Sequence, residues 1–348
     1  MSELQETKTS SSKKGLYWLI ALVLAAVLLY FSLRGIDWAE VWQIVSRAKI
    51  AYVFLALFIS TFSLFLRAFR WRILLQAQAP VPVNTAFWAT SAGYFGNNFL
   101  PARAGELVRT MMVSSATGLS KTFVLTTALT ERLADAIALV LISSVVLLTL
   151  PFRPGWFDNA ARPFAILGFG GALAILIVPK LEKVWHAIVM RLPIPRAIGD
   201  RLADILTHVH VGLRAFHDWA RLLGFLSLTV VIWFSDAFST LIGMHALGMS
   251  TTLPVALLLI TGLGLGSALP STPGYVGIYQ FVAVGVLVPF GFSKTNAIAY
   301  ILLAQALQYV YITLWGLIAF ARSRNISFRS RPVDQSALSP KESFSRSR

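Results

Sequence analysis

The sequence contains no cysteine and few acidic residues. Without cysteine, the chain cannot form a disulfide framework, a zinc–thiolate cluster or a thiol nucleophile. Asp and Glu number 15 against 30 Lys and Arg, and charged residues make up only 13% of the chain, whereas hydrophobic residues make up 56%. A soluble chain of 348 residues needs far more polar surface than this. The composition therefore predicts an integral membrane protein.

The net charge of +15 lies mainly in tails and in loops between the hydrophobic runs. Positive loops are typical of the cytoplasmic side of membrane proteins, so charge distribution accounts for the excess without a nucleic-acid partner. Contact with anionic lipid headgroups is compatible with the same distribution. We therefore expect membrane lipids as partners and no nucleic acid.

Several apolar runs reach or approach the roughly 20 residues that a helix needs to cross a bilayer. The predicted fold is an all-α polytopic helical bundle, with about six full spans and two broken, re-entrant hairpins. The expected full spans cover residues 16–33, 51–66, 120–150, 164–178, 222–247 and 294–320.

The two hairpins contain the same short pattern of residues. A Leu-Pro pair ends at Pro101 and is followed four residues later by Gly105; a second ends at Pro270 and is followed by Gly274. Interrupted, Gly- and Pro-containing segments in corresponding places of two halves point to the binding site of a transporter. This pattern predicts an internal repeat.

A second match supports the repeat, because Gly118-Leu-Ser-Lys-Thr122 recurs as Gly291-Phe-Ser-Lys-Thr295. The repeat halves cover about residues 51–150 and 222–320. The positive-inside rule makes the two hairpins enter from opposite faces, so the repeats are expected to be inverted.

The remaining segments complete the predicted domain layout. Residues 1–15 form a disordered tail, residues 16–322 a transmembrane domain and residues 323–348 a basic tail. Within the domain, residues 180–221 read as an amphipathic helix on the membrane surface. We expect both termini on the cytoplasmic side of the cell inner membrane.

Three motifs in this order resemble the flippase-like membrane domain of the lysylphosphatidylglycerol synthases and their stand-alone relatives. They are Asn98-x-Leu-Pro-Ala-Arg-x-Gly-Glu106, Glu131-Arg132-x-x-Asp135 and Pro270-x-x-Pro-Gly-x-x-Gly277. The resemblance covers roughly residues 16–322 and implies movement of a lipid or glycolipid across the bilayer. The chain ends without room for the soluble aminoacyl-transferring domain, so we do not expect the synthase activity.

Ionisable residues inside a span cost roughly 2.5–3.5 kcal/mol each at its centre and need a reason to be there. Glu131 and Asp135 share a helix face, while Arg132 points about a quarter-turn away. One interpretation is an internal salt-bridge set that holds the first hairpin through Arg103 or Arg109. The other is a water-filled cavity that receives a polar headgroup.

The preferred phosphate contact is Arg103, which lies near the start of a short helix and has the planar fork that suits a phosphate. In the second hairpin, Ser271 or Thr272 is expected to cap a helix that has Pro273 at its first position. For Asp236, a structural hydrogen bond and a proton-coupling role remain open. The basic cluster at residues 67–72 reads as a cytoplasmic boundary.

The repeat places Arg132 opposite Gln305 and Asp135 opposite Gln308. No metal site is expected, and no cofactor. The complete set of predicted substrate-binding residues is Asn98, Arg103, Glu106, Arg109, Glu131, Arg132, Asp135, Ser271, Thr272, Gln305 and Gln308.

The leading hypothesis is translocation of a phospholipid or lipid-linked headgroup, with no enzymatic activity. The alternatives are a small-solute or ion transporter, a membrane-embedded lipid-modifying enzyme, and a scaffold for lipid-synthesis enzymes. The first alternative needs only a compact site. The second needs a nucleophile–base pair or a metal cluster, and the sequence contains neither.

Overall fold

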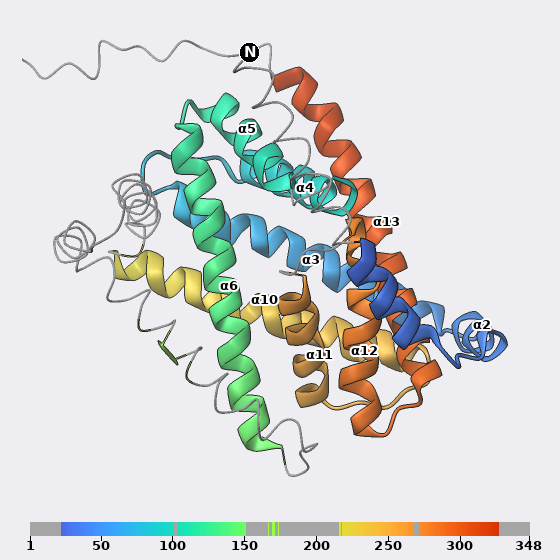
Figure 1. Cartoon of the computed structure of the whole chain (residues 1–348). Helices are drawn as coiled ribbons and strands as arrows, with labels where there is room; N and C mark the ends of the chain where they lie inside the picture. Colours follow the sequence, from blue (N-terminus) through green and yellow to red (C-terminus); the bar gives the residue numbers. More distant parts are fainter. Residues whose placement is uncertain are drawn as a thin grey trace, which may run out of the picture.

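The computed structural model describes residues 22–100, 104–150, 218–267 and 272–326, together with residues 166, 169, 170, 173 and 216. Every regular element in these ranges is a helix (Figure 1). The described helices long and apolar enough to cross a membrane cover Ile50–Leu75, Trp219–Ala246, Pro273–Phe290 and Lys294–Ser323. The predicted all-α polytopic membrane fold is therefore confirmed.

Two groups of four helices follow the same order of long, short, short and long. The first group consists of α3 (Ile50–Leu75), α4 (Val83–Phe99), α5 (Gly105–Thr117) and α6 (Lys121–Thr149). The second group consists of α10 (Trp219–Ala246), α11 (Leu253–Gly266), α12 (Ile278–Leu287) and α13 (Lys294–Ile326). Single 3₁₀ turns, η4 (Pro273–Tyr275) and η5 (Val288–Phe290), flank α12.

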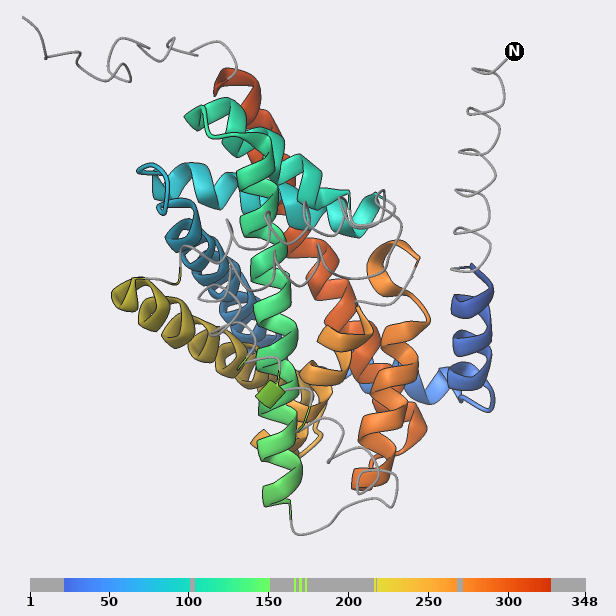
Figure 2. The ribbon, with the colours of Figure 1, turned by 60° about the vertical axis from the view of Figure 1, so that its left-hand side comes forward.

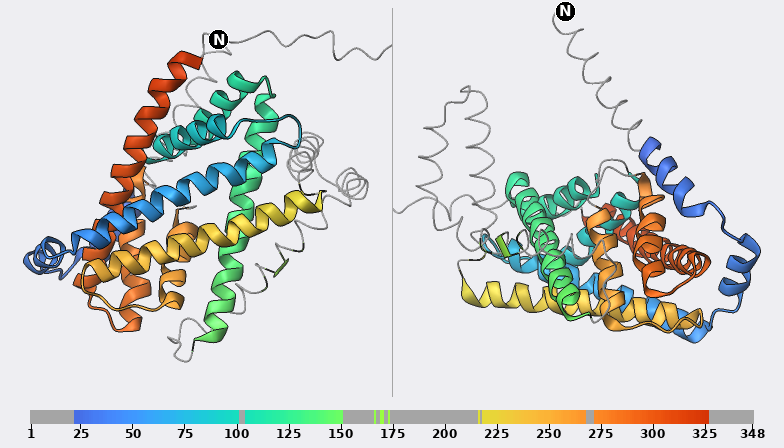
Figure 3. Two further views of the ribbon diagram at one scale, coloured as in Figure 1. Left: turned by 180° about the vertical axis from the view of Figure 1, so that it is seen from behind. Right: turned by 60° about the horizontal axis from the view of Figure 1, so that its bottom comes forward.

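The contacts between the two groups are those of a twofold arrangement. Helix α4 of the first hairpin packs on α13, and its counterpart α11 packs on α6. The corresponding helices α3 and α10 lie side by side and run in opposite directions (Figure 3), and α6 and α13 also run in opposite directions (Figure 2). Antiparallel corresponding helices are what an inverted repeat requires.

The matching turns in the sequence have matching conformations. Gly118 follows α5 with φ of 74° and Gly291 follows η5 with φ of 90°, a left-handed conformation that glycine adopts without steric cost. Three residues after each glycine, α6 begins at Lys121 and α13 begins at Lys294. The repeat inferred from Gly-x-Ser-Lys-Thr therefore marks the start of the last helix in each half.

Close packing explains the glycines of the first hairpin. A Cβ on Gly105 would lie 1.9 Å from the carbonyl oxygen of Gly93, and one on Gly96 would lie 2.8 Å from the Cα of Gly105. Helices α4 and α5 can approach this closely only because these positions lack side chains. Gly274 also meets a close approach, but from the hydroxyl of Tyr309 rather than from backbone.

The glycines at positions 262 and 264 of α11 allow close packing against neighbouring helices. A Cβ on Gly262 would meet Val282 of α12, and one on Gly264 would meet Leu139 of α6. Eight of the 14 residues of α11 are buried, and its buried apolar side chains belong to the largest apolar cluster of the described residues.

Two of the expected spans have other bounds or another shape in the structure, and α6, expected as a full span, is not among the described helices found long and apolar enough to cross a membrane. The second span does not end at residue 66, because α3 continues to Leu75 and includes the basic cluster. The helix Leu22–Leu33 is followed by α2 (Trp38–Ser46) at an angle of 84°, so this pair forms a bent element. The expected span at 164–178, nearly all of the amphipathic stretch and both tails lie outside the described residues.

Candidate functional site

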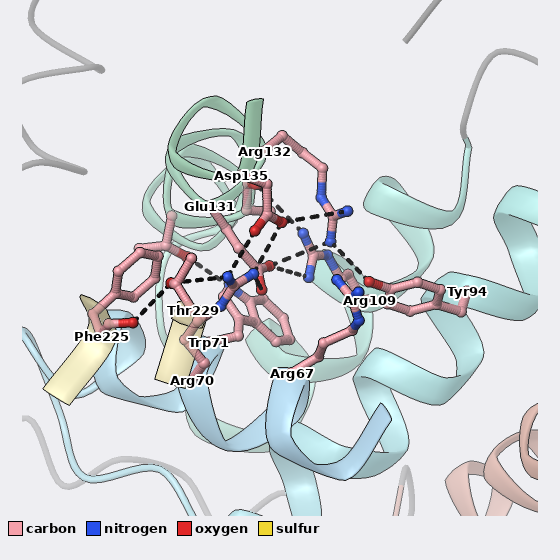
Figure 4. A network of polar contacts seen from close by, with 12 residues as sticks. Arg67, Arg70, Trp71, Tyr94, Arg109, Glu131, Arg132, Asp135, Phe225 and Thr229 are labelled. Atoms are coloured by element: carbon pink, nitrogen blue, oxygen red, sulfur yellow. Dashed lines mark hydrogen bonds and ion pairs between the residues drawn. The ribbon is translucent and has the colours of Figure 1, made fainter. Parts of the chain in front are cut away.

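The centre of the first half is a buried arginine that the sequence interpretation assigned to the membrane boundary. Arg70 of α3 is fully buried, and its two terminal nitrogens donate to the two carboxylate oxygens of Asp135 at 2.7 and 2.9 Å. It also donates to Glu131 at 2.9 Å and to Thr229 of α10 at 3.1 Å (Figure 4). One guanidinium therefore joins three helices.

A second arginine attaches the first hairpin to the same carboxylates. Arg109 of α5 donates from Nη1 to Glu131 at 2.8 Å and from Nε to Glu106 at 2.6 Å. Its guanidinium lies 4.4 Å from the centre of the Trp71 ring. Because Glu131 accepts from Arg70 as well as Arg109, it bridges α3 and α5 through α6. These charges form an internal salt-bridge set that holds the hairpin.

Arg132 lies next to Glu131 in the chain but has a different environment. Its side chain is 27% exposed, and its nitrogens lie no closer than 3.5 Å to Glu106, 3.6 Å to Glu131 and 3.9 Å to Asp135. It donates to the hydroxyl of Tyr94 at 3.3 Å, and its Nε makes no hydrogen bond within the described residues (Figure 4). Arg132 thus keeps hydrogen-bonding capacity for another group.

This arginine lines a cavity of about 260 Å³ between the two halves. Both hairpins contribute to the wall, Asn98 from α4 and Tyr279 from α12 among them. Among the described lining residues the charged side chains are Arg67, Arg132 and Asp236. Arg70 and Arg109 do not line the cavity, so the structural and the accessible arginines are separate sets.

Arg67 and Asp236 form an ion pair in the cavity wall. Ser63 donates a hydrogen bond of 2.6 Å to the same carboxylate, and the guanidinium lies 4.9 Å from the Trp233 ring. Arg67 and Asp236 are 169 residues apart, the separation that also relates Gly105 to Gly274. The pair therefore joins corresponding positions of the two halves.

Amide side chains occupy the corresponding region of the second half. Gln308 of α13 lines the cavity and donates to Asn98 at 3.4 Å. Gln305 is buried away from the cavity, donates to the carbonyl oxygen of Gly274 at 3.0 Å and accepts from Gln280. In the first half, ion pairs of Arg109 hold the hairpin in place. In the second half, hydrogen bonds of the neutral amides Gln280 and Gln305 hold the corresponding hairpin.

The predicted residues therefore separate into groups. Of those described, Asn98, Arg132, Gln308 and Asp236 line the cavity. Those that bind other protein groups instead are Glu106, Arg109, Glu131, Asp135 and Gln305. The preferred phosphate ligand Arg103 and the expected cap Ser271 lie outside the described residues.

The structure contradicts the predicted cap at Thr272, whereas the alternative cap Ser271 lies outside the described residues. Thr272 precedes only the three-residue turn η4, and its hydroxyl donates to the carbonyl oxygen of Val276 at 3.0 Å instead of capping. The longer helix α12 begins at Ile278, and the backbone N–H of Gly277 just before it donates to the side chain of Gln280 at 2.8 Å. The hairpin therefore aims no Thr-capped helix at the cavity.

The assignment of residues 67–72 to a cytoplasmic boundary is also corrected. Arg67 and Arg70 are three residues apart on one face of α3, where α10 and α6 supply carboxylates. Only Arg72 turns away, with its Nε hydrogen-bonded to the carbonyl oxygen of Val81. The available sequence signal was the presence of Glu131, Asp135 and Asp236 in apolar helices, since carboxylates there require cationic partners.

The described residues contain no group of three or more His, Cys, Asp or Glu side chains arranged to hold a metal ion. The described cavity wall offers several kinds of polar and aromatic group. These are two guanidinium groups, one carboxylate, amides, hydroxyls and aromatic rings.

Comparison with known proteins places this architecture in a recognised group. A family model described as the lysylphosphatidylglycerol synthase TM region matches residues 18–316. A UPF0104 membrane protein of Methanothermobacter thermautotrophicus is 23% identical over 331 residues, covering 88% of this chain and 93% of the relative. A UPF0104 membrane protein of Pyrococcus horikoshii is 24% identical over 341 residues, covering 90% and 98%.

A further relative is named for an enzymatic activity. Glycosyltransferase AglD of Haloferax volcanii is 25% identical over 357 residues, which cover 92% of this chain and 55% of the relative. No solved structure matches the chain.

Proposed function

This chain belongs to the lysylphosphatidylglycerol synthase TM region family, and we propose that it translocates a lipid with an anionic headgroup across the membrane. The observation that carries the proposal is the cavity between the two inverted halves, into which Arg132 presents a guanidinium that the described carboxylates do not saturate. A guanidinium offers several donors in a planar fork, which matches the oxygens of a phosphate.

The size of the cavity supports binding of a headgroup rather than a whole lipid. A volume of about 260 Å³ corresponds to roughly nine water molecules at about 30 Å³ each. This is enough for a phosphate and its substituent, but too little for two acyl chains. During the proposed translocation, the headgroup occupies the cavity while the acyl chains of the lipid remain in the bilayer.

The inverted arrangement supports alternating access to both leaflets. Helices α3 and α10 cross the centre side by side, and rocking of one half against the other would change which face reaches the cavity. The pair Arg67–Asp236 lies at this junction. An anionic headgroup can compete with Asp236 for Arg67, and we infer that this exchange links headgroup binding to movement of the halves.

The proposed setting is the cell inner membrane with both termini cytoplasmic, which agrees with the basic loops and tails of the sequence. Enzymes that synthesise the lipid on one side of the membrane are suitable partners, because they would supply the lipid that this protein translocates.

The test is a translocation assay with the purified full chain in phospholipid vesicles. The probe is phosphatidylglycerol with an unmodified headgroup and a fluorophore on one acyl chain, and an impermeant reductant added outside destroys only the outer-leaflet signal. We expect the slow phase of signal loss to accelerate relative to protein-free vesicles. Equal rates would contradict translocation of this lipid class. Mass spectrometry of the recovered probe separates translocation from enzymatic modification, which would change the headgroup mass.

A further inference from the structure

The cavity wall contains an unusual number of aromatic hydroxyl groups. Four tyrosines of the second half line it, and the first half adds Tyr94. Tyr94 is engaged with Arg132, and Trp233 lies against Arg67. The second-half tyrosines are Tyr275, Tyr279, Tyr300 and Tyr311.

Two of these tyrosines form a stack of rings, and the outer ring face of this stack is the surface called the platform below. The rings of Tyr275 and Tyr279 are stacked, with centroids 4.9 Å apart and planes inclined by 13°. Tyr275 has φ of 62°, the single positive φ of a non-glycine residue in the described part of the chain. A bulky residue adopts this conformation only where its surroundings enforce it, and such strain concentrates at binding sites.

Contacts of the neighbouring residue hold the backbone of Tyr275 in this conformation. The preceding residue, Gly274, accepts a hydrogen bond of 3.0 Å from Gln305, and its Cα faces the hydroxyl of Tyr309 too closely for any side chain. Gln280 in turn donates to Gln305. This buried amide network holds the turn that directs Tyr275 into the cavity wall.

Other cavity-lining residues carry polar atoms that are buried and have no hydrogen-bond partner within the described residues. They are Asn97 Oδ1, Asn98 Nδ2, Trp233 Nε1 and Arg132 Nε. Asn98 and Trp233 are only 3% and 7% exposed. Buried polar atoms of native proteins are nearly always paired, so these sites fit a ligand that offers both acceptors and donors.

We propose that the headgroup is a sugar joined to a phosphate, an assignment that rests on the translocation function proposed above. Arg132 and Arg67 bind the phosphate. The platform of Tyr275 and Tyr279 packs against the apolar C–H face of the sugar ring, because aromatic rings give large contact area beside polar groups. The amides of Asn97 and Asn98 bind the sugar hydroxyls.

The charge of the wall disfavours a headgroup that bears an amino group. Its described charged residues are two arginines and one aspartate, and the aspartate is already paired with Arg67. An ammonium group would meet like charge there without a free carboxylate, at a cost that burial increases. A neutral, hydroxyl-rich substituent on the phosphate meets the amides and tyrosines instead.

The test measures uptake of two radiolabelled, short-chain lipids by vesicles that contain the full chain. One is citronellyl hexosyl phosphate; its control is citronellyl methyl phosphate, which has the same tail and the same single charge. We expect the hexosyl compound to enter about tenfold faster, the effect of one good stacking contact with hydrogen bonds. Equal uptake of the two compounds would overturn the sugar assignment.

Two variants connect this preference to the platform. Tyr275→Gly removes the ring and suits the positive φ, so it should lower hexosyl uptake about tenfold without lowering the thermal midpoint. Methyl phosphate uptake should stay constant, and Tyr275→Phe should keep most of the preference. If Tyr275→Gly lowers both uptakes equally, or leaves both unchanged, the platform does not bind the sugar.

Different experimental results would contradict the sugar assignment and the proposed translocation function. If labelled phosphatidylglycerol is translocated but the hexosyl compound shows no advantage, only the sugar assignment is overturned. If neither lipid class crosses faster than in protein-free vesicles, both fail.

Discussion

Arg67 forms its ion pair with Asp236, the residue that occupies the corresponding position in the second half of the chain. The two halves thus meet at one position through side chains of opposite charge. Both groups line the cavity, and their side chains are 12% and 22% exposed. The pair is a contact between the halves and also part of the proposed binding site.

This relationship predicts strong coupling between the two residues. Arg67→Gln and Asp236→Asn should each lower stability, because each leaves one charge without its partner. The double variant should lose less than the sum, with a coupling energy of about 0.5–3 kcal/mol. Thermal denaturation of the purified proteins in detergent measures it. Additive effects would mean that the pair contributes nothing.

The set around Arg70 predicts a structural role instead. Arg70→Ala should destabilise the fold by about 3–5 kcal/mol, because it leaves Glu131 and Asp135 buried with part of their charge unpaired. Arg70→Lys should also fail, since one ammonium cannot reproduce two parallel hydrogen bonds to Asp135. The readout is monodispersity on size-exclusion chromatography.

The matched control is Arg221→Gln, at an exposed arginine whose contact to Asp218 is 3.4 Å. A single exposed ion pair contributes about 0–1 kcal/mol, so this variant should behave as wild type. A stable, monodisperse Arg70→Ala protein would refute the structural assignment.

The first hairpin predicts an unusual sensitivity to one methyl group. Gly105→Ala places a Cβ 1.9 Å from the carbonyl oxygen of Gly93, so α4 and α5 must separate, at a cost of about 1–3 kcal/mol or more. Gly285→Ala in α12 meets nothing within 4 Å and should be neutral or slightly stabilising. Thermal midpoints of the two variants give the comparison. Equal tolerance would show that the close approach is not required.

The inverted repeat predicts opposite exposure of two equivalent serines. Ser120 and Ser293 are exposed and precede the last helix of each half, and the chain has no native cysteine. Ser120→Cys should react with an impermeant maleimide from the cytoplasmic side, and Ser293→Cys from the other. Labelling of both from one side of sealed vesicles would contradict the inverted arrangement.

The sequence allowed prediction of the features that depend on local chemistry. Gly105 and Gly274 were recognisable because close neighbours, the backbone of Gly93 and the hydroxyl of Tyr309, leave no room for a side chain at those positions. Lys121 and Lys294 were recognisable because each begins a helix within the repeated Gly-x-Ser-Lys-Thr pattern. The carboxylate at Glu131 was recognisable because charge is rare in apolar helices.

Features that depend on distant partners were not predictable in the same way. Arg70 lies in a basic, aromatic cluster that is typical of a membrane boundary, and only the packing of α6 against α3 reveals its carboxylate partners. The left-handed conformation of Tyr275 has no local sequence signal either. It depends on Gln305 and Tyr309 of α13, which fix the position of the preceding residue, Gly274.

The most direct test of the proposed function is translocation by the Arg132 variants. Arg132→Gln should reduce translocation of chain-labelled phosphatidylglycerol at least about tenfold while the protein stays monodisperse, because Arg132 lies 3.5 Å or more from the carboxylates that Arg70 and Arg109 hold at 2.6–2.9 Å. Arg132→Lys should fall between this variant and wild type, since it keeps the charge but loses the fork. Arg221→Gln should translocate as wild type does. If monodisperse Arg132→Gln moves the lipid as fast as wild type, the cavity does not bind the headgroup as proposed.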